Sequence, residues 1–140
     1  MLANAKSGLE ELTLSGNRLG GIGVGALCGG LNVNTSLQKL KIADNFIDQT
    51  DEDLNALTRL ASVLLNGTTK IVGVDLMYNR IGTSGGEILL PVVDGDNKNK
   101  EISEFLVDQT IPMALFEKLY KAGGGKKGGK KKGGGKKKKK

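Results

Sequence analysis

The chain of 140 residues contains no histidine and a single cysteine, Cys28. Without histidine it lacks the commonest general base and the commonest metal ligand of proteins. One cysteine cannot form an internal disulfide, so we expect an intracellular, reducing location. No apolar run approaches the roughly 18 residues of a membrane span, the longest being residues 88–93, and residues 1–8 lack the apolar core of a signal peptide. These absences argue against a histidine-based active site, secretion and membrane insertion.

Charge is divided unevenly along the chain. Residues 1–121 hold 11 Lys or Arg and all 15 Asp and Glu, whereas residues 122–140 hold ten Lys, eight Gly and one Ala. The net charges of the two parts are therefore about −4 and about +10. Residues 123–140 cannot build a core, so we expect a disordered tail extended by self-repulsion. The sequence thus predicts a mildly acidic domain over 1–121 and a polybasic Gly/Lys tail over 122–140.

Three segments of the domain repeat one apolar pattern, and a fourth repeats most of it. The pattern is L-x-x-L-x-L-x-x-N-x-L, where L stands for any aliphatic residue. Its copies begin at Leu9, Leu37, Ile71 and Ile102, at spacings of 28, 34 and 31 residues. The fourth copy keeps the apolar positions but has Thr110 in place of the asparagine. Self-similarity of this kind is typical of a solenoid of leucine-rich repeats.

Each copy predicts one short strand of a parallel sheet. Leu12 and Leu14, two residues apart, point to one side of an extended chain, and Thr13 points to the other. The asparagines that follow the strands lie where the chain turns inward. They are Asn17, Asn45 and Asn79. We expect their amides to bond buried backbone groups of the turn and of the next repeat, which would otherwise lack partners.

The segments after the asparagines predict helices, because apolar residues four apart share one helical face. Those residues are Gly23, Leu27 and Leu31 in the first repeat and Gly85, Leu89 and Val93 in the third. In the second repeat, Thr50 and Asp53 form a capping-box-like pair ahead of a helix about six residues longer than its counterparts. Its apolar stripe comprises Leu54, Leu57, Leu60, Ala61, Leu64 and Leu65.

The two ends of the array differ. Residues 110–112, Thr-Ile-Pro, predict the start of a short amphipathic helix that closes the core. Its apolar residues are Leu115, Phe116, Leu119 and Tyr120. At the other end, residues 1–8 resemble the close of a preceding repeat. A first strand without a cap exposes backbone groups and apolar surface, so we expect an upstream region or a protein partner to cover it.

A strand, an asparagine turn and a helix within 28 to 34 residues resemble the ribonuclease-inhibitor-like subfamily of leucine-rich repeats, over about residues 2–121. The resemblance implies an α/β solenoid arc of about four strand-turn-helix repeats, with a parallel sheet on the concave side. It implies protein binding and no single activity. The subfamily includes inhibitors, GTPase activators, immune receptors and cytoskeletal or ciliary components.

Other motifs point to structure. The segment 21–25, Gly-x-Gly-x-Gly, has its third glycine one residue early for a dinucleotide loop, so we interpret it as a packing turn. The segment 94–105 begins like a calcium loop but lacks its obligatory glycine and final glutamate. Residues 51–53, Asp-Glu-Asp, suit the positive end of a helix dipole. Cys28 has no histidine to activate it and reads as a small helix residue. We predict no catalytic, metal or cofactor-binding residue.

Two surfaces are predicted to bind partners. The concave face should comprise the strand residues that point away from the core, foremost Thr13, Lys39, Lys41 and Asp75, with Val72, Glu104 and Leu106. The tail should bind polyanions through Lys126, Lys127, Lys130, Lys131, Lys132, Lys136, Lys137, Lys138, Lys139 and Lys140. Two or three glycines separate the three lysine clusters, which keeps the charge mobile.

The favoured hypothesis is a structural or adaptor module of a larger assembly. Its Gly/Lys tail looks like those of ciliary and flagellar axoneme proteins, where a polycation meets the acidic tails of tubulin in microtubules. The alternative is a nucleic-acid or ribosome binder in the nucleus or cytoplasm, although no aromatic residue is interleaved with the lysines for base stacking. A small-GTPase regulator is less favoured, because that branch resembles a longer arc with an acidic C-terminal segment. We expect cytoplasmic, cytoskeletal or ciliary localisation and no membrane partner.

Overall fold

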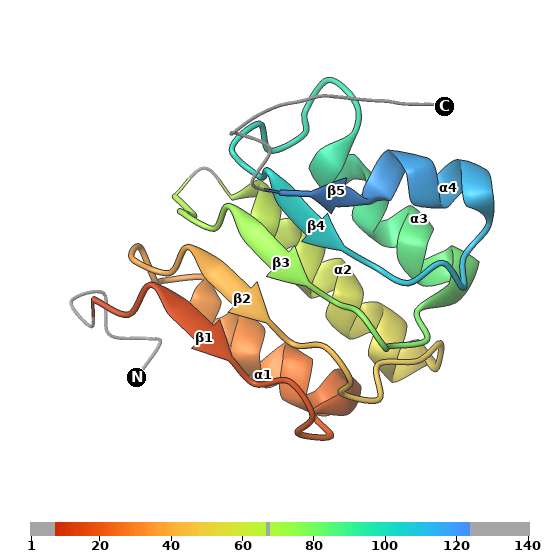
Figure 1. Cartoon of the computed structure of the whole chain (residues 1–140). Helices are drawn as coiled ribbons and strands as arrows, with labels where there is room; N and C mark the ends of the chain where they lie inside the picture. Colours follow the sequence, from red (N-terminus) through yellow and green to blue (C-terminus); the bar gives the residue numbers. More distant parts are fainter. Residues whose placement is uncertain (1–7, 67, 124–140) are drawn as a thin grey trace.

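The computed structural model describes residues 8–66 and 68–123. Within them, strands and helices alternate along the chain. The elements are β1 (Glu11–Thr13), α1 (Gly20–Leu31), β2 (Lys39–Lys41), α2 (Asp51–Leu65), β3 (Gly73–Asp75), α3 (Gly82–Val93), β4 (Glu104–Leu106), α4 (Met113–Leu119) and β5 (Lys121–Ala122). The strands form one sheet in sequence order, and the helices cover one of its faces (Figure 1). Each repeat therefore packs against its sequence neighbours, as in a solenoid.

The strands β1 to β4 are parallel and share one register. Their central residues, Leu12, Leu40, Val74 and Phe105, pair across the sheet. All four occupy the second apolar position of the repeated pattern, and the last three are fully buried beneath the helices. The arrangement confirms the predicted α/β solenoid of four strand-turn-helix repeats.

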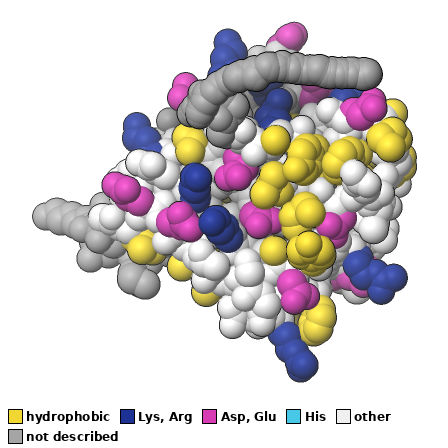
Figure 2. Space-filling model, in the orientation of Figure 1, with side chains coloured by type: hydrophobic (Ala, Val, Ile, Leu, Met, Phe, Trp, Pro, Cys, Tyr) yellow, Lys and Arg dark blue, Asp and Glu magenta, His cyan; other side chains and the backbone are white. Residues whose placement is uncertain are grey.

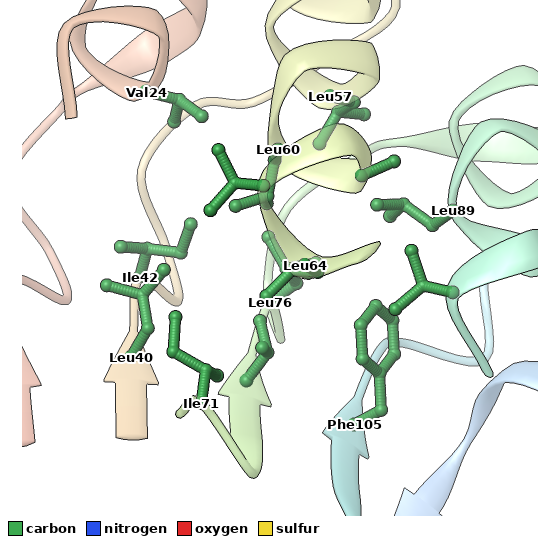
Figure 3. Close-up of a cluster of buried hydrophobic side chains, with 14 of the residues drawn as sticks. Val24, Leu40, Ile42, Leu57, Leu60, Leu64, Ile71, Leu76, Leu89 and Phe105 are labelled. Carbon is green, nitrogen blue, oxygen red and sulfur yellow. The ribbon is translucent and has the colours of Figure 1, made fainter. Parts of the chain in front are cut away.

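The core lies between the sheet and the helices, with α2 at its centre (Figure 3). Leu57, Leu60 and Leu64 of α2 are fully buried there, as the apolar stripe predicts. Leu65, at the end of α2, is instead exposed. The helix has 15 residues against 12 in α1 and α3, so it is longer than its counterparts by three residues and not by six.

The buried face of α1 differs from the predicted one. Val24, Cys28 and Leu31 are buried, while Leu27 is half-buried at the edge of the core. The face is thus rotated by about one residue, and the buried Gly21 and Gly25 share it with Val24 and Cys28 and lie against α2. Burial raises the pKa of the Cys28 thiol to about 11, although the nearby positive charge of Arg59 acts to lower this pKa. This cysteine is a buried core residue. In α3, the predicted residues Gly85, Leu89 and Val93 are all buried.

The sheet ends on a strand that the sequence does not predict. β5 pairs antiparallel with β4, through Glu104 with Ala122 and Phe105 with Lys121. The described strand thus extends to Ala122, one residue past the predicted end of the domain. α4 follows Pro112 as predicted and buries Leu119 in the core. The predicted lysine tail, from residue 124 on, and the predicted near-end segment, residues 1–7, lie outside the described residues.

Asn45 and Asn79 bond buried backbone groups of the turn, as predicted, but they reach the preceding repeat and not the next one. Asn79 shows this most fully. Its Oδ1 accepts hydrogen bonds from the backbone N–H groups of Asn45 (2.9 Å) and Ile47 (3.1 Å), both in the preceding repeat. Its Nδ2 donates to the carbonyls of Ile42 and Leu76, each at 3.1 Å. The side chain is buried. Nδ2 also lies 3.4 Å from the Met77 carbonyl, so one carboxamide bonds five backbone groups of two repeats.

Asn45 repeats this geometry one repeat earlier. Its Oδ1 accepts from the N–H groups of Asn17 (2.9 Å) and Leu19 (3.1 Å), and its Nδ2 donates to the carbonyls of Leu14 and Ala43, both at 3.0 Å. The Asn17 amide donates to Leu14 (2.7 Å) but lies exposed at the edge of the array. The buried asparagines therefore form a ladder that joins consecutive turns.

We expect Asn79→Ala to lower the free energy of unfolding by about 3 kcal/mol or more, because several buried backbone groups lose their partner. Asn17→Ala is the matched control and should cost about 1 kcal/mol, since water reaches that amide. Urea denaturation followed by circular dichroism measures both. Equal losses in the two variants would contradict the ladder's role.

The glycine motif of α1 serves helix packing. The N–H of Gly21 donates to Oδ1 of Asp53 at 2.8 Å, and a Cβ at position 21 would lie 2.8 Å from the Asp53 Cα and from the Glu52 carbonyl oxygen. Asp53 also accepts from the N–H of Asp48 (3.0 Å), and its own N–H donates to Thr50 Oγ1 (3.1 Å). The predicted Thr50–Asp53 capping pair is therefore present through the Asp53 N–H. The Asp53 carboxylate, however, bonds Gly21 and Asp48 and so joins the start of α1 to the start of α2.

Gly21→Ala should therefore destabilise the protein by about 1–3 kcal/mol, because the added methyl group meets the backbone of α2. Gly29, in the same helix, is exposed and has nothing within 4 Å of an added Cβ. Gly29→Ala should stabilise the protein by about 0.5–1 kcal/mol, through the higher helix propensity of alanine. Thermal denaturation should show a lower melting temperature for Gly21→Ala and a higher one for Gly29→Ala. A Gly21→Ala protein as stable as the wild type would refute the packing interpretation.

Candidate protein-binding surface

The sheet face opposite the helices presents the alternate residues of β1 to β4, and we call it the outer sheet face. These residues are Glu11, Thr13, Lys39, Lys41, Gly73, Asp75, Glu104 and Leu106. They include the four main residues predicted for the concave face. Val72 is an exception, because it precedes β3, and Gly73 takes the outward position in its place. Figure 2 shows charged side chains of both signs interleaved on part of the molecule and hydrophobic side chains gathered beside them.

Two ion pairs organise the charged part of this face. Lys41 Nζ lies 3.0 Å from Glu11 Oε2, and Lys39 Nζ lies 4.0 Å from Glu104 Oε1. The hydrogen bond to Glu11, together with its charge, raises the pKa of Lys41. Exposed pairs of this kind add little to stability, so their main effect is on the charge pattern that a partner meets.

Gly73 makes the second pair possible. Lys39 is on β2 and Glu104 is on β4, so their side chains meet across the intervening strand β3. A Cβ at position 73 would lie 2.8 Å from Glu104 Oε1 and 3.6 Å from Lys39 Cγ. The missing side chain therefore leaves room for an ion pair that skips a strand.

A hollow of about 700 Å³ lies beside the charged part, between the loops that follow β3 and β4 and the helix α4. We call it the aromatic hollow. Its lining residues are Met77, Tyr78, Val107, Asp108, Gln109, Thr110, Phe116 and Tyr120. The rings of Phe116 and Tyr120 stack with centroids 5.0 Å apart. Asp108 Oδ2 accepts a hydrogen bond from the backbone N–H of Tyr78 at 2.6 Å, which joins the two loops.

Leu115, Phe116, Leu119 and Tyr120 were predicted to close the core, and the prediction is wrong for Tyr120 alone, because Leu119 lies in the core and Leu115 and Phe116 pack against it. Leu119 is the buried residue of α4, Phe116 is half-buried, and Tyr120 is exposed. α4 ends at Leu119 and Tyr120 has an extended backbone, so its ring leaves the helical face that the sequence pattern predicts. The spacing of four residues between Phe116 and Tyr120 was the one signal that could have placed their rings together, although Tyr120 lies just past the end of α4.

The segments that resembled ligand loops have structural roles. In the calcium-like segment 94–105, Asn99 Nδ2 donates to the Leu64 carbonyl at 2.7 Å and fastens the loop to the end of α2. Over residues 8–66 and 68–123, no three His, Cys, Asp or Glu side chains are grouped so that they could hold a metal ion. No helix in the described part of the chain has the length and apolar character to cross a membrane.

Comparison with known families agrees with this architecture. A leucine-rich repeat family model matches residues 8–28, which span β1, the first asparagine turn and most of α1. A search of curated proteins finds no match to the chain. The matched unit recurs along the structure as strand, turn and helix. The match covers one repeat, and the recurrence of the same unit along the described residues is consistent with an α/β arc of the leucine-rich repeat type, a fold that generally binds other proteins through its extended face.

Proposed function

We propose that the protein is a non-catalytic, protein-binding module of a larger assembly, the ciliary axoneme or another microtubule-based structure, with its lysine tail as an electrostatic tether. The binding role is carried by the outer sheet face, where rigid strands hold Lys39, Lys41, Glu11 and Glu104 in fixed positions. Alternating charges on a rigid face select a partner of matching pattern. Leu40 and Val74, behind these residues, are buried, so binding and folding use separate side chains.

The tail supports the tether. It carries ten lysines and no acid within residues 122–140. A polycation binds a polyanion mainly by releasing counterions, without a fitted site. Acidic tubulin tails offer such a polyanion, and the tail's likeness to those of axoneme proteins favours them. RNA is another polyanion, and lysine side chains are attracted to its phosphate groups. A ribosomal or nuclear role is therefore the second candidate function.

Reversing the charge of both lysines, Lys39→Glu with Lys41→Glu, should weaken binding to salt-washed axonemes at least about tenfold while the fold is retained. Co-sedimentation measures binding, and circular dichroism with thermal denaturation measures the fold. A quadruple variant, which adds Glu11→Lys and Glu104→Lys to the two lysine substitutions, restores both ion pairs with reversed polarity. It should still fail to bind. Unchanged binding of the double variant would exclude this face as the interface; loss of its folded signal would make the lysines structural.

The tail prediction compares the full chain with a chain ending at Gly123, which keeps β5 intact. A full-length variant with all tail lysines changed to glutamine controls for length. At about 50 mM salt we expect the full chain to co-sediment with microtubules and the two variants not to do so. The binding of the full chain should fall steeply as the salt concentration rises. If both variants bind as the full chain does, the tether is refuted. If they lose RNA binding more than microtubule binding, the ribosomal or nuclear alternative replaces the axonemal one.

A further inference from the structure

Two exposed aromatic residues have an unfavourable backbone conformation. Phe46 and Tyr78 have φ of +58° and +60°, and their side chains are 62% and 70% exposed. Bulky residues rarely adopt positive φ, and the first repeat has Gly16 at the position equivalent to Tyr78. Exposed rings gain little hydrophobic stabilisation to offset this cost. The turn requires this backbone conformation, since Gly16 and Asp44 share it with Tyr78, but it does not require an aromatic side chain. A bulky ring kept at such a position is a sign of function.

One of these rings already binds a guanidinium group within the chain. The Cζ atom of Arg18 lies 5.6 Å from the centroid of the Phe46 ring, within the range of a cation–π interaction. Arg18 belongs to the preceding repeat and also has positive φ, at +55°. The loop after β2 therefore presents an aromatic ring as a platform for arginine.

The second ring, that of Tyr78, lines the aromatic hollow together with Phe116 and Tyr120. Among the described residues that line it, Asp108 is the only charged one. Its carboxylate is held beside Tyr78 by the hydrogen bond from the Tyr78 N–H. Ring faces attract cations, apolar walls accept an aliphatic stem, and a carboxylate pairs with a planar guanidinium.

We propose that the aromatic hollow binds an arginine side chain of the protein partner, with the guanidinium over the rings and paired with Asp108. The inference rests on the proposed protein-binding function and names the chemistry that the partner must present. Arginine fits better than lysine, because its planar, weakly hydrated head stacks on rings and pairs with a carboxylate at once. The internal pair of Arg18 and Phe46 shows this chemistry one repeat away.

The test uses the ¹⁵N-labelled full chain and the peptide acetyl-Gly-Ser-Arg-Ser-Gly-amide, titrated at about 150 mM salt, where nonspecific attraction is screened. We expect saturable shifts of the backbone amide signals of Tyr78, Asp108, Gln109 and Tyr120, with a Kd in the millimolar range. The same peptide with citrulline, which keeps the shape and loses the charge, should bind at least about tenfold more weakly. Binding of both peptides with equal affinity would overturn the proposal.

Two variants remove the site without threatening the fold. Tyr78→Gly suits the positive φ and deletes the ring, and Asp108→Asn keeps an acceptor oxygen for the Tyr78 N–H and deletes the charge. Each substitution should lower the affinity for the arginine peptide at least about fivefold. Phe46→Gly is the matched control, with the same φ and exposure outside the hollow, and should bind as the wild type does.

Besides equal binding of the two peptides, three results of the titration contradict the proposal. They are the absence of saturable shifts, retained affinity in Tyr78→Gly, and equal loss in Phe46→Gly. A difference at the same amides between the free full chain and a chain ending at Gly123 would assign the hollow to the chain's own lysines and would also overturn it. Failure here leaves the broader function open, because the charge reversal of Lys39 and Lys41 tests that function on a different part of the surface.

Discussion

The need to bond buried backbone groups at each inward turn is the constraint on which this structure depends. A turn between a strand and a helix places N–H and C=O groups where water cannot reach them. Asn79 and Asn45 bond these groups in their own repeat and in the repeat before it. Because one carboxamide spans two repeats, it sets the register of the strands as well as the path of the turn.

The register decides which side chains are available for binding. With Leu40, Val74 and Phe105 paired and facing the helices, their neighbours must face solvent. That alternation brings Lys39 opposite the side-chain-free Gly73 and within reach of Glu104. The same turns hold Tyr78 at positive φ at the mouth of the aromatic hollow. The fold and the arrangement of the outer sheet face thus have one physical cause.

The repeated pattern was sufficient to predict what local spacing controls. Strands, turn asparagines and the α3 face follow from residues two, three or four apart. The sequence could not predict β5, since Lys121 and Ala122 carry no strand pattern and pair only because β4 presents an edge. The aromatic hollow was missed because Tyr78 and Phe116 are far apart in the chain and meet through the packing of α4. Likewise, the strand-skipping ion pair depends on an absent side chain, which no pattern of apolar residues reveals.

Native-state hydrogen exchange tests the central claim most directly. The N–H groups of Asn45 and Ile47 lie in a loop yet bond to the buried Oδ1 of Asn79. If this ladder unites the repeats, both amides exchange only through global unfolding, with the same free energy of opening as the N–H of Leu60 in the core of α2. Exchange at the rate of exposed loop amides, while Leu60 stays protected, would show that the repeats are held together without the asparagines.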